Sequence, residues 1–253
     1  MSEAYQILNI DLEMGTKYLI NESAYFLGGI FAANESVISK GDKYWIAPVR
    51  YNPTKVSSEE LEEHFQHVKT LATKLSNQTL MANIIRNNGL NSGKFHKRFP
   101  GFGTFFKTKG EQTLEEMIIE VKRALFNSTM EVKRSFIVGM FDSRGSIDRN
   151  KDSGTMRYIV LDCDNDTVGD FLCEALDNYG FSYNYNRARQ RLEGGRPRKN
   201  QLRIPARENY IERIGFISTR KFNDAVSCYD STTSYIIKNE DNVLSGLKTI
   251  ERV

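Results

Sequence analysis

Two stretches of the chain combine many cationic side chains with almost no acids, a composition that suits contact with a polyanion. Residues 81–110 contain no Asp or Glu, and residues 187–207 contain one acid, Glu193. Lysine and arginine neutralise phosphates, while arginine and asparagine read base edges. The pattern predicts binding of double-stranded DNA. We expect the contacts from Arg86, Lys94, Lys97, Arg98 and Lys107 in the first stretch, and from Arg187, Arg189, Arg191, Arg196, Arg198, Lys199 and Arg203 in the second.

The second stretch shows a period of two. Arg187, Arg189 and Arg191 alternate along the chain, and Tyr183 and Tyr185 precede them in the same phase. Alternate residues of a β-strand share one face, so we expect these side chains to lie together on a groove of DNA. A solvated charged surface is the structural alternative, and a surface that meets acidic proteins is a further functional one. The net charge of +3 does not decide between them.

The chain offers little other chemistry. His64 and His67 are three residues apart, with Glu60 and Glu63 nearby, a spacing that favours a solvated helix face over a metal site. The cysteines form no CxxC pair and no zinc-type cluster, so we expect reduced thiols in an intracellular, cytoplasmic protein. These cysteines are Cys163, Cys173 and Cys228. No apolar run reaches the about 20 residues of a membrane-spanning helix.

The sequence contains an internal repeat, and each copy of it precedes one of the basic stretches. Residues 25–37 recur in outline as residues 135–147, and Phe26 matches Phe136 at an offset of 110 positions. At the same offset Gly29 matches Gly139. Both segments are apolar on most sides, which indicates buried helices. Glycines remove side-chain bulk, so we expect Gly28, Gly29 and Gly139 to lie where the two helices pack together.

Capping residues and apolar runs predict the remaining elements. Ser128 with Glu131 has the form of a capping box, and Asn21 is the N-cap expected for the first helix. Further helices are predicted over 57–75, 167–179 and 207–217, and strands over 44–51, 156–161, 181–189 and 201–204. Each half then has the order helix, strands, helix, strands, helix, an α+β fold. The halves are predicted to span residues 1–125 and 126–253.

In the repeated segments the sequence resembles the LAGLIDADG homing endonucleases in their single-chain, two-repeat form. The family motif resembles Phe-Leu-Ala-Gly-Phe-Phe-Asp-Gly-Asp-Gly-Ser, and here it stands at residues 26–36 and 136–146. The resemblance implies two αββαββα-type repeats whose motif helices pack at a pseudo-two-fold axis. It also implies a saddle-shaped antiparallel sheet from each half, lying in the major groove.

The positions that the resemblance makes catalytic have lost their acids. In the family, each motif helix ends in an acidic residue, and the two carboxylates hold the divalent metal that activates water. The matching residues are Asn34, a weak neutral ligand, and Arg144, a permanent cation without an acceptor atom. Arg144 at that position would repel a metal ion and is expected to contact a phosphate.

Two interpretations of the site remain open. In the favoured one, the fold is kept for DNA recognition at an asymmetric site, hydrolysis is lost, and no metal or other cofactor is expected. The chain is then a monomer that acts as a specificity module of a restriction-like or regulatory system. In the alternative, Glu35 and Asp142 form a displaced magnesium site, and the chain is a site-specific DNA endonuclease.

Overall fold

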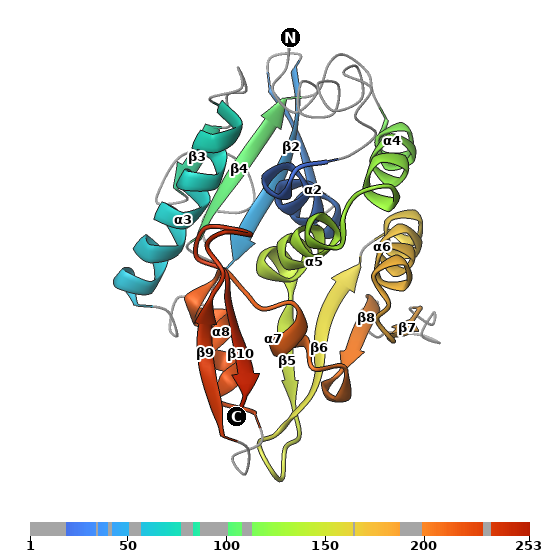
Figure 1. Ribbon diagram of the computed structural model, residues 1–253. Helices are drawn as coiled ribbons and strands as arrows, with labels where there is room; N and C mark the ends of the chain where they lie inside the picture. Colours follow the sequence, from blue (N-terminus) through green and yellow to red (C-terminus); the bar gives the residue numbers. More distant parts are fainter. Residues whose placement is uncertain are drawn as a thin grey trace, which may run out of the picture.

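The computed structural model describes residues 19–33, 35–39, 42–50, 57–76, 83–86, 101–107, 113–163, 165–187, 199–229 and 234–253. Its elements fall into two series that begin with the same order of helix, two strands, helix and two strands (Figure 1). The first series comprises α2 (Asn21–Ala33), β1 (Glu35–Ser39), β2 (Asp42–Arg50), α3 (Ser58–Ser76), β3 (Asn83–Arg86), β4 (Gly101–Lys107) and α4 (Leu114–Phe126). The second comprises α5 (Met130–Arg144), β5 (Ser146–Arg149), β6 (Met156–Cys163), α6 (Asp166–Tyr179), β7 (Asn184–Asn186), β8 (Asn200–Pro205), η2 (Ala206–Glu208), α7 (Tyr210–Arg213), α8 (Thr219–Val226), β9 (Tyr235–Asn239) and β10 (Lys248–Arg252).

The two halves form matching antiparallel sheets. The strand order is β1-β2-β4-β3 in one and β5-β6-β8-β7 in the other, so each strand of one sheet has a counterpart in the other sheet. The last strands, β9 and β10, pair separately as a two-stranded ribbon. This arrangement confirms the predicted α+β fold of two similar repeats.

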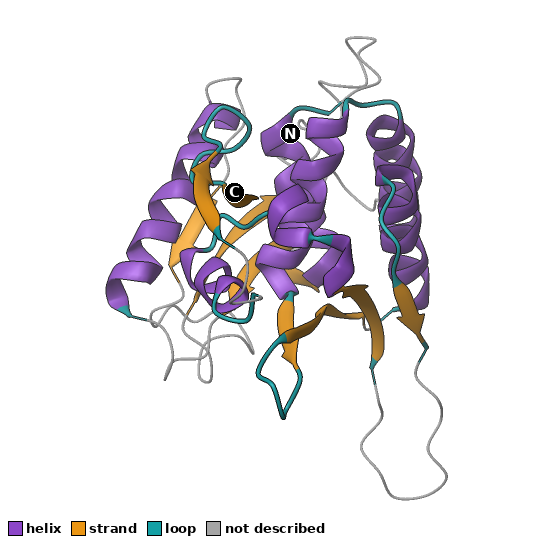
Figure 2. Cartoon of the chain, turned by 60° about the horizontal axis from the view of Figure 1, so that its bottom comes forward, coloured by secondary structure: helices purple, strands orange, loops and turns teal. Residues whose placement is uncertain are grey.

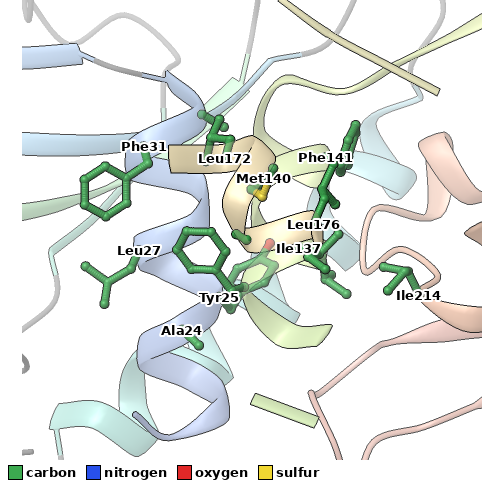
Figure 3. Packing of buried hydrophobic residues seen from close by; sticks show 14 of the residues in the cluster. Ala24, Tyr25, Leu27, Phe31, Ile137, Met140, Phe141, Leu172, Leu176 and Ile214 are labelled. Atoms are coloured by element: carbon green, nitrogen blue, oxygen red, sulfur yellow. The ribbon is translucent and has the colours of Figure 1, made fainter. Parts of the chain in front are cut away.

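The repeated helices α2 and α5 lie side by side at the centre of the molecule (Figure 1). Residues 23–33 of α2 and 135–143 of α5 are buried on every side of their helices, as their apolar composition predicts. Aromatic rings join the halves, because Phe31 of α2 lies 5.0 Å from Phe171 of α6 and 6.3 Å from Phe136 of α5, centroid to centroid. Figure 3 shows buried hydrophobic residues of α2, α5 and α6 around this contact, among them Leu27, Met140 and Leu172.

Two glycines allow the backbones of α2 and α5 to approach closely. A Cβ atom on Gly28 would lie 2.0 Å from the carbonyl oxygen of Phe136, and one on Gly139 would lie 1.8 Å from that of Tyr25. Gly28 corresponds to Gly139, and Tyr25 corresponds to Phe136, so each contact becomes the other when the two halves are interchanged. Such reciprocal contacts are expected around a two-fold axis. They pair Gly28 with Gly139, whereas the sequence match paired Gly29. Gly29 also lies in the contact, where its carbonyl accepts a hydrogen bond from Ser143 Oγ at 3.2 Å.

The offset between the halves is therefore 111 positions, and the predicted offset of 110 was wrong by one. The helices end at Ala33 and Arg144, and the strands that follow begin at Glu35 and Ser146. Adjacent glycines at 28 and 29 allow either match in the sequence, and the contact of Gly28 with Phe136 of α5 decides between them.

The capping predictions were partly wrong. Thr129, not Ser128, is the N-cap of α5, and its side chain accepts from Val132 N. Ser128 Oγ instead donates to Ala124 O and accepts from Leu19 N, which connects the halves. Asn21 is the first residue of α2, and its amide donates to Val243 O in place of capping the helix.

The bounds of other predicted helices and strands can be compared with the structure in the same way. The helix predicted over 57–75 is α3, which begins at Ser58 after a capping box between Ser57 and Glu60, and Gly180 ends α6 with φ +85°. The helix predicted over 207–217 is interrupted, because Asn209 has a φ of 54° and separates η2 from α7. The strand predicted over 181–189 is restricted to β7 within the described residues.

Candidate nucleic-acid interface

The centre of the candidate interface is the end of the paired helices, where Arg144 is the last residue of α5. Its Nη2 donates to the carbonyl oxygen of Ala33, the last residue of α2, at 3.3 Å. Because the halves correspond at an offset of 111, Ala33 and Arg144 are the equivalent positions. Asn34, which the sequence match had placed there, lies outside the described residues. An alanine and an arginine cannot supply paired carboxylates to a metal ion.

Asp142 is fully buried beside this end of α5. Its Oδ2 accepts from Ile217 N at 3.1 Å and from Tyr25 Oη at 3.3 Å, and its Oδ1 accepts from Ser218 N at 3.2 Å. Burial raises the pKa of Asp142 to about 6, against the opposing effect of nearby Lys221. The carboxylate fixes the turn that precedes α8. Three acceptor sites of the Asp142 carboxylate are thus taken by protein donors, and the side chain has no exposed surface on which to meet a metal ion.

A second cation, which the sequence analysis missed, stands at the same helix end. Lys221 Nζ donates to the carbonyl oxygens of Phe141 at 2.7 Å and Asp142 at 2.5 Å. Burial lowers the pKa of Lys221 to about 7, and the positive charge of Arg144 acts in the same direction. Ser218 caps α8 and so places Lys221 in its first turn. The local sequence carries no sign of this role, because only the tertiary fold brings α8 to α5.

The other candidate for a displaced metal site is Glu35. It is the first residue of β1, directly after the end of α2, and the position of its side chain lies outside the description. Within the described part of the chain, no group of three or more His, Cys, Asp or Glu side chains could hold a metal ion. His64 is fully buried, so the solvated position predicted for it was wrong, whereas the side chains of His67 and Glu63 are partly exposed.

Helices lie on one face of the sheet β5-β6-β8-β7, and among the described residues no helix covers the other face, which is called the open face below (Figure 2). Alternation along β8 buries Leu202 and Ile204 and puts Gln201 and Arg203 on the open face. On one side of Arg203, Val160 of β6 lies opposite it and Ser146 of β5 lies opposite Val160. On the other side, Asn184 of β7 lies opposite Arg203. These four residues form one row across the sheet.

Side chains on this open face are held in position by one another. The Arg203 guanidinium lies 5.7 Å from the ring centroid of Tyr158 and donates to Gln201 Oε1. Gln201 Nε2 in turn donates to Asp162 Oδ1 at 2.9 Å. Arginine and amide side chains at such positions match the hydrogen-bonding edges of guanine and adenine in the major groove.

Arg187, the one alternating arginine that the structure describes, belongs to the other face of the sheet. Tyr185 points toward the helices, since a Cβ atom on Gly169 of α6 would lie 2.0 Å from Tyr185 Oη. Arg187 follows in the same phase, and its Nη2 bonds both oxygens of Asp170 on α6, at 2.8 and 3.0 Å. The expectation that Tyr185 and Arg187 lie on the groove side was therefore wrong, because α6 covers the face that they share.

The remaining predicted contacts are described only in part. Lys199 directly precedes β8 and is exposed. Arg86 ends β3 and Lys107 ends β4, with only their backbone described. The others lie outside the described residues, namely Lys94, Lys97, Arg98, Arg189, Arg191, Arg196 and Arg198.

No protein-family model and no curated protein sequence matches this chain. Among solved structures, it is similar to I-DmoI in complex with DNA and Mn, with 16% identity and a TM-score of 0.45 over 77% of this chain and 96% of that one. It is also similar to mesophilic variants of the homing endonuclease I-DmoI, with 16% identity and a TM-score of 0.46 over 77% of this chain and 94% of theirs. Likeness at this level does not assign a family. No helix in the described ranges is long and apolar enough to cross a membrane.

Proposed function

We propose that the chain binds double-stranded DNA at an asymmetric site and does not cut it. The observation that carries the proposal is the pairing of Arg144 with Ala33 at the end of the central helices. There the motif resemblance would require two carboxylates. A guanidinium at that position opposes a divalent cation and favours a phosphate.

The open face of the second sheet supports DNA as the partner. Arg203, Gln201 and Asn184 lie on it in adjacent strands and present donors and acceptors of the kind that read base edges. The strands of the first half differ in sequence, with Gly-Phe-Gly-Thr-Phe-Phe-Lys in β4 against Asn-Gln-Leu-Arg-Ile-Pro in β8. Two different reading surfaces on one chain match two different half-sites, so a monomer recognises an asymmetric sequence.

A chain that recognises DNA without cutting it suits an intracellular role as a specificity module, in which a partner subunit supplies cleavage or regulation. The nuclease alternative would depend on Glu35 and Asp142 with magnesium. It is disfavoured because the Asp142 carboxylate already binds two backbone N–H groups and a tyrosine hydroxyl.

Selection of bound duplexes from a randomised library tests the proposal. We expect one asymmetric consensus, and an affinity for it that falls steeply with salt, because counterions leave the phosphates on binding. The selected duplex is then compared with a single-stranded copy and with a scrambled duplex. Enrichment of no sequence, together with no duplex binding at low salt, would instead favour an acidic protein as the partner.

A further inference from the structure

We propose that Gln201 positions Arg203 and Asp162 as a donor and an acceptor that read two base pairs of one duplex, guanine through Arg203 and cytosine through Asp162. The inference rests on the proposed function, because the bases belong to the bound DNA. It names the bases that the open face of the second sheet would select, and it gives an acidic side chain a role in recognising a polyanion.

The three side chains form a continuous series of contacts on the open face. The register places Asp162 of β6 opposite Gln201 of β8, and Arg203 lies two residues further along β8. Arg203 Nη2 donates to Gln201 Oε1, and Gln201 Nε2 donates to Asp162 Oδ1 at 2.9 Å. The Arg203 guanidinium also lies 5.7 Å from the ring centroid of Tyr158, a distance at which a cation is attracted to an aromatic face. All four residues belong to strands, so their positions depend little on loops.

The chemistry of its neighbours fixes the orientation of the Gln201 amide. An arginine side chain only donates hydrogen bonds, so it meets the amide oxygen, and an ionised carboxylate only accepts, so it meets the amide nitrogen. A reversed amide would place donor against donor at Arg203 and acceptor against acceptor at Asp162. Gln201 is therefore a positioning residue that sets where the guanidinium and the carboxylate point.

Both ends of the series keep hydrogen-bonding capacity. A guanidinium carries several N–H donors and a carboxylate several acceptor positions, and Gln201 uses only one of each. The side chain of Asp162 is exposed. In the major groove guanine presents the acceptors O6 and N7, which match arginine, whereas cytosine presents the N4 amino group, which matches a carboxylate.

The spacing of the two groups suits two different base pairs. Arg203 and Asp162 are diagonal neighbours on adjacent strands, and the α-carbons of such neighbours lie about 7–8 Å apart. Successive base pairs are stacked about 3.4 Å apart. The two side chains therefore face base pairs about two steps apart in the same groove.

A carboxylate on a DNA-binding face also selects by repulsion. Guanine and thymine present acceptors to the major groove, and these repel a carboxylate, which has no donor to offer. Specificity is a difference of affinities and gains from a rejected base as well as from an accepted one. Asp162 should thus lower the affinity for duplexes with guanine or thymine at its base pair and spare those with cytosine.

The competing explanation gives Asp162 and Gln201 only a structural role, in which they hold Arg203 and balance its charge. Removing the charge of Asp162 would then change the affinity by the same factor whatever base stands at any position. Base reading makes the change depend on the base at one position.

The experiment measures the affinity of the selected duplex, and of every single-base variant of it, for wild type and three variants. Asp162→Asn should reduce a preference for cytosine at one base pair by about tenfold, chiefly because duplexes with guanine or thymine there bind more tightly. Gln201→Leu, which removes both hydrogen bonds, should weaken the guanine and the cytosine preference together. Gln201→Glu keeps an acceptor for Arg203 but repels Asp162, so it should weaken only the cytosine preference.

Asp170→Asn is the matched control. It removes the same charge from the helix-covered side of the sheet, where Asp170 bonds Arg187. It should leave the preference at every base pair unchanged. Thermal unfolding of each variant shows that it is folded, and Gln201→Glu and Asp162→Asn carry the test if Gln201→Leu does not fold.

The possible failures can be told apart. A change by the same factor for all duplexes in folded Asp162→Asn would overturn the reading of cytosine while DNA binding stands. Loss of preference at a single base pair in folded Gln201→Leu would show that Gln201 does not position both readers. Absence of binding to any duplex would overturn the proposed function, and this inference with it.

Discussion

The guanidinium Nη2 of Arg144 lies 3.3 Å from the carbonyl oxygen of Ala33, its counterpart 111 positions earlier in the chain. The contact joins the ends of two helices that occupy the same place in two similar halves. One half supplies a cation at this point, and the other supplies a methyl group and a backbone acceptor. Both halves therefore share the architecture of the helix pair. The two residues at its end, however, carry no carboxylate and cannot perform chemistry that needs a pair of carboxylates.

The close approach of α2 and α5 predicts that neither contact glycine tolerates a side chain. Gly28→Ala or Gly139→Ala places a Cβ within about 2 Å of a backbone oxygen that cannot move without shifting the opposite helix. We expect each to lower the free energy of unfolding by about 3 kcal/mol or more, at the upper end of overpacking effects. Denaturant titration measures this loss.

Gly154 provides the control, because nothing lies within 4 Å of a Cβ added there. Its φ of +70° is one that asparagine tolerates, so Gly154→Asn should change the stability by much less. Equal effects at Gly139 and Gly154 would mean that the helices do not pack as closely as described.

The buried carboxylate of Asp142 predicts a specific pH dependence of stability. Its pKa is about 6 in the folded chain, against 3.8 as the ordinary value, so between these values the folded state binds more protons than the unfolded state. Its contribution to the free energy of unfolding therefore rises as the pH falls from about 6 to about 4. Lys221 stays protonated throughout this window, since its pKa is about 7.

Chemical denaturation of wild type and Asp142→Asn across that window isolates the contribution, because other carboxylates titrate in both proteins. The stability of wild type relative to the variant should increase toward low pH by at most about 3 kcal/mol, given about 1.4 kcal/mol for each pKa unit. A difference that stays flat, or that changes in the opposite direction, would show that Asp142 is not held as described.

The two faces of the second sheet predict unequal effects for two arginines. Arg203 lies on the open face over Tyr158, whereas Arg187 is bound to Asp170 on the helix-covered side. Arg203→Ala should weaken binding to the selected duplex by about 1–3 kcal/mol and relax the preference at one base pair. Arg187→Ala should cost less and leave the preference intact.

Binding measured against all single-base variants of the selected duplex separates the two effects. Arg203→Lys keeps the charge but loses the two-point contact with guanine, so it should retain more affinity than specificity. If Arg187→Ala changes the base preference and Arg203→Ala does not, the assignment of the faces is incorrect.

The sequence predicts more of the architecture than of the site. Buried helices and the order of strands follow from apolar patterns that act locally, and the predicted helix over 57–75 begins at Ser58, next to its expected first residue, where Ser57 and Glu60 form a capping box. The offset between the halves was missed by one residue, because Gly28 and Gly29 are chemically identical and only the packing distinguishes them.

The site depends on contacts between distant parts of the chain. Lys221 donates to the carbonyl oxygen of Asp142, which lies 79 positions earlier in the chain. No local sequence pattern around Lys221 predicts this contact. The alternation of residues in the sequence predicts that Tyr185 and Arg187 share one face of the sheet. It does not predict which of the two faces a helix will cover. That choice is made by the packing of α6, where Gly169 leaves room for Tyr185.

The most direct test of the account is to incubate the selected duplex with the wild-type chain in magnesium and in manganese and to look for strand breaks while binding is monitored on the same sample. We predict a bound and intact duplex in both metals, with affinity nearly unchanged in Glu35→Gln, because Ala33 and Arg144 cannot hold a catalytic metal. Metal-dependent cutting at one position that disappears in Glu35→Gln or in Asp142→Asn would contradict the account and establish a displaced-site nuclease.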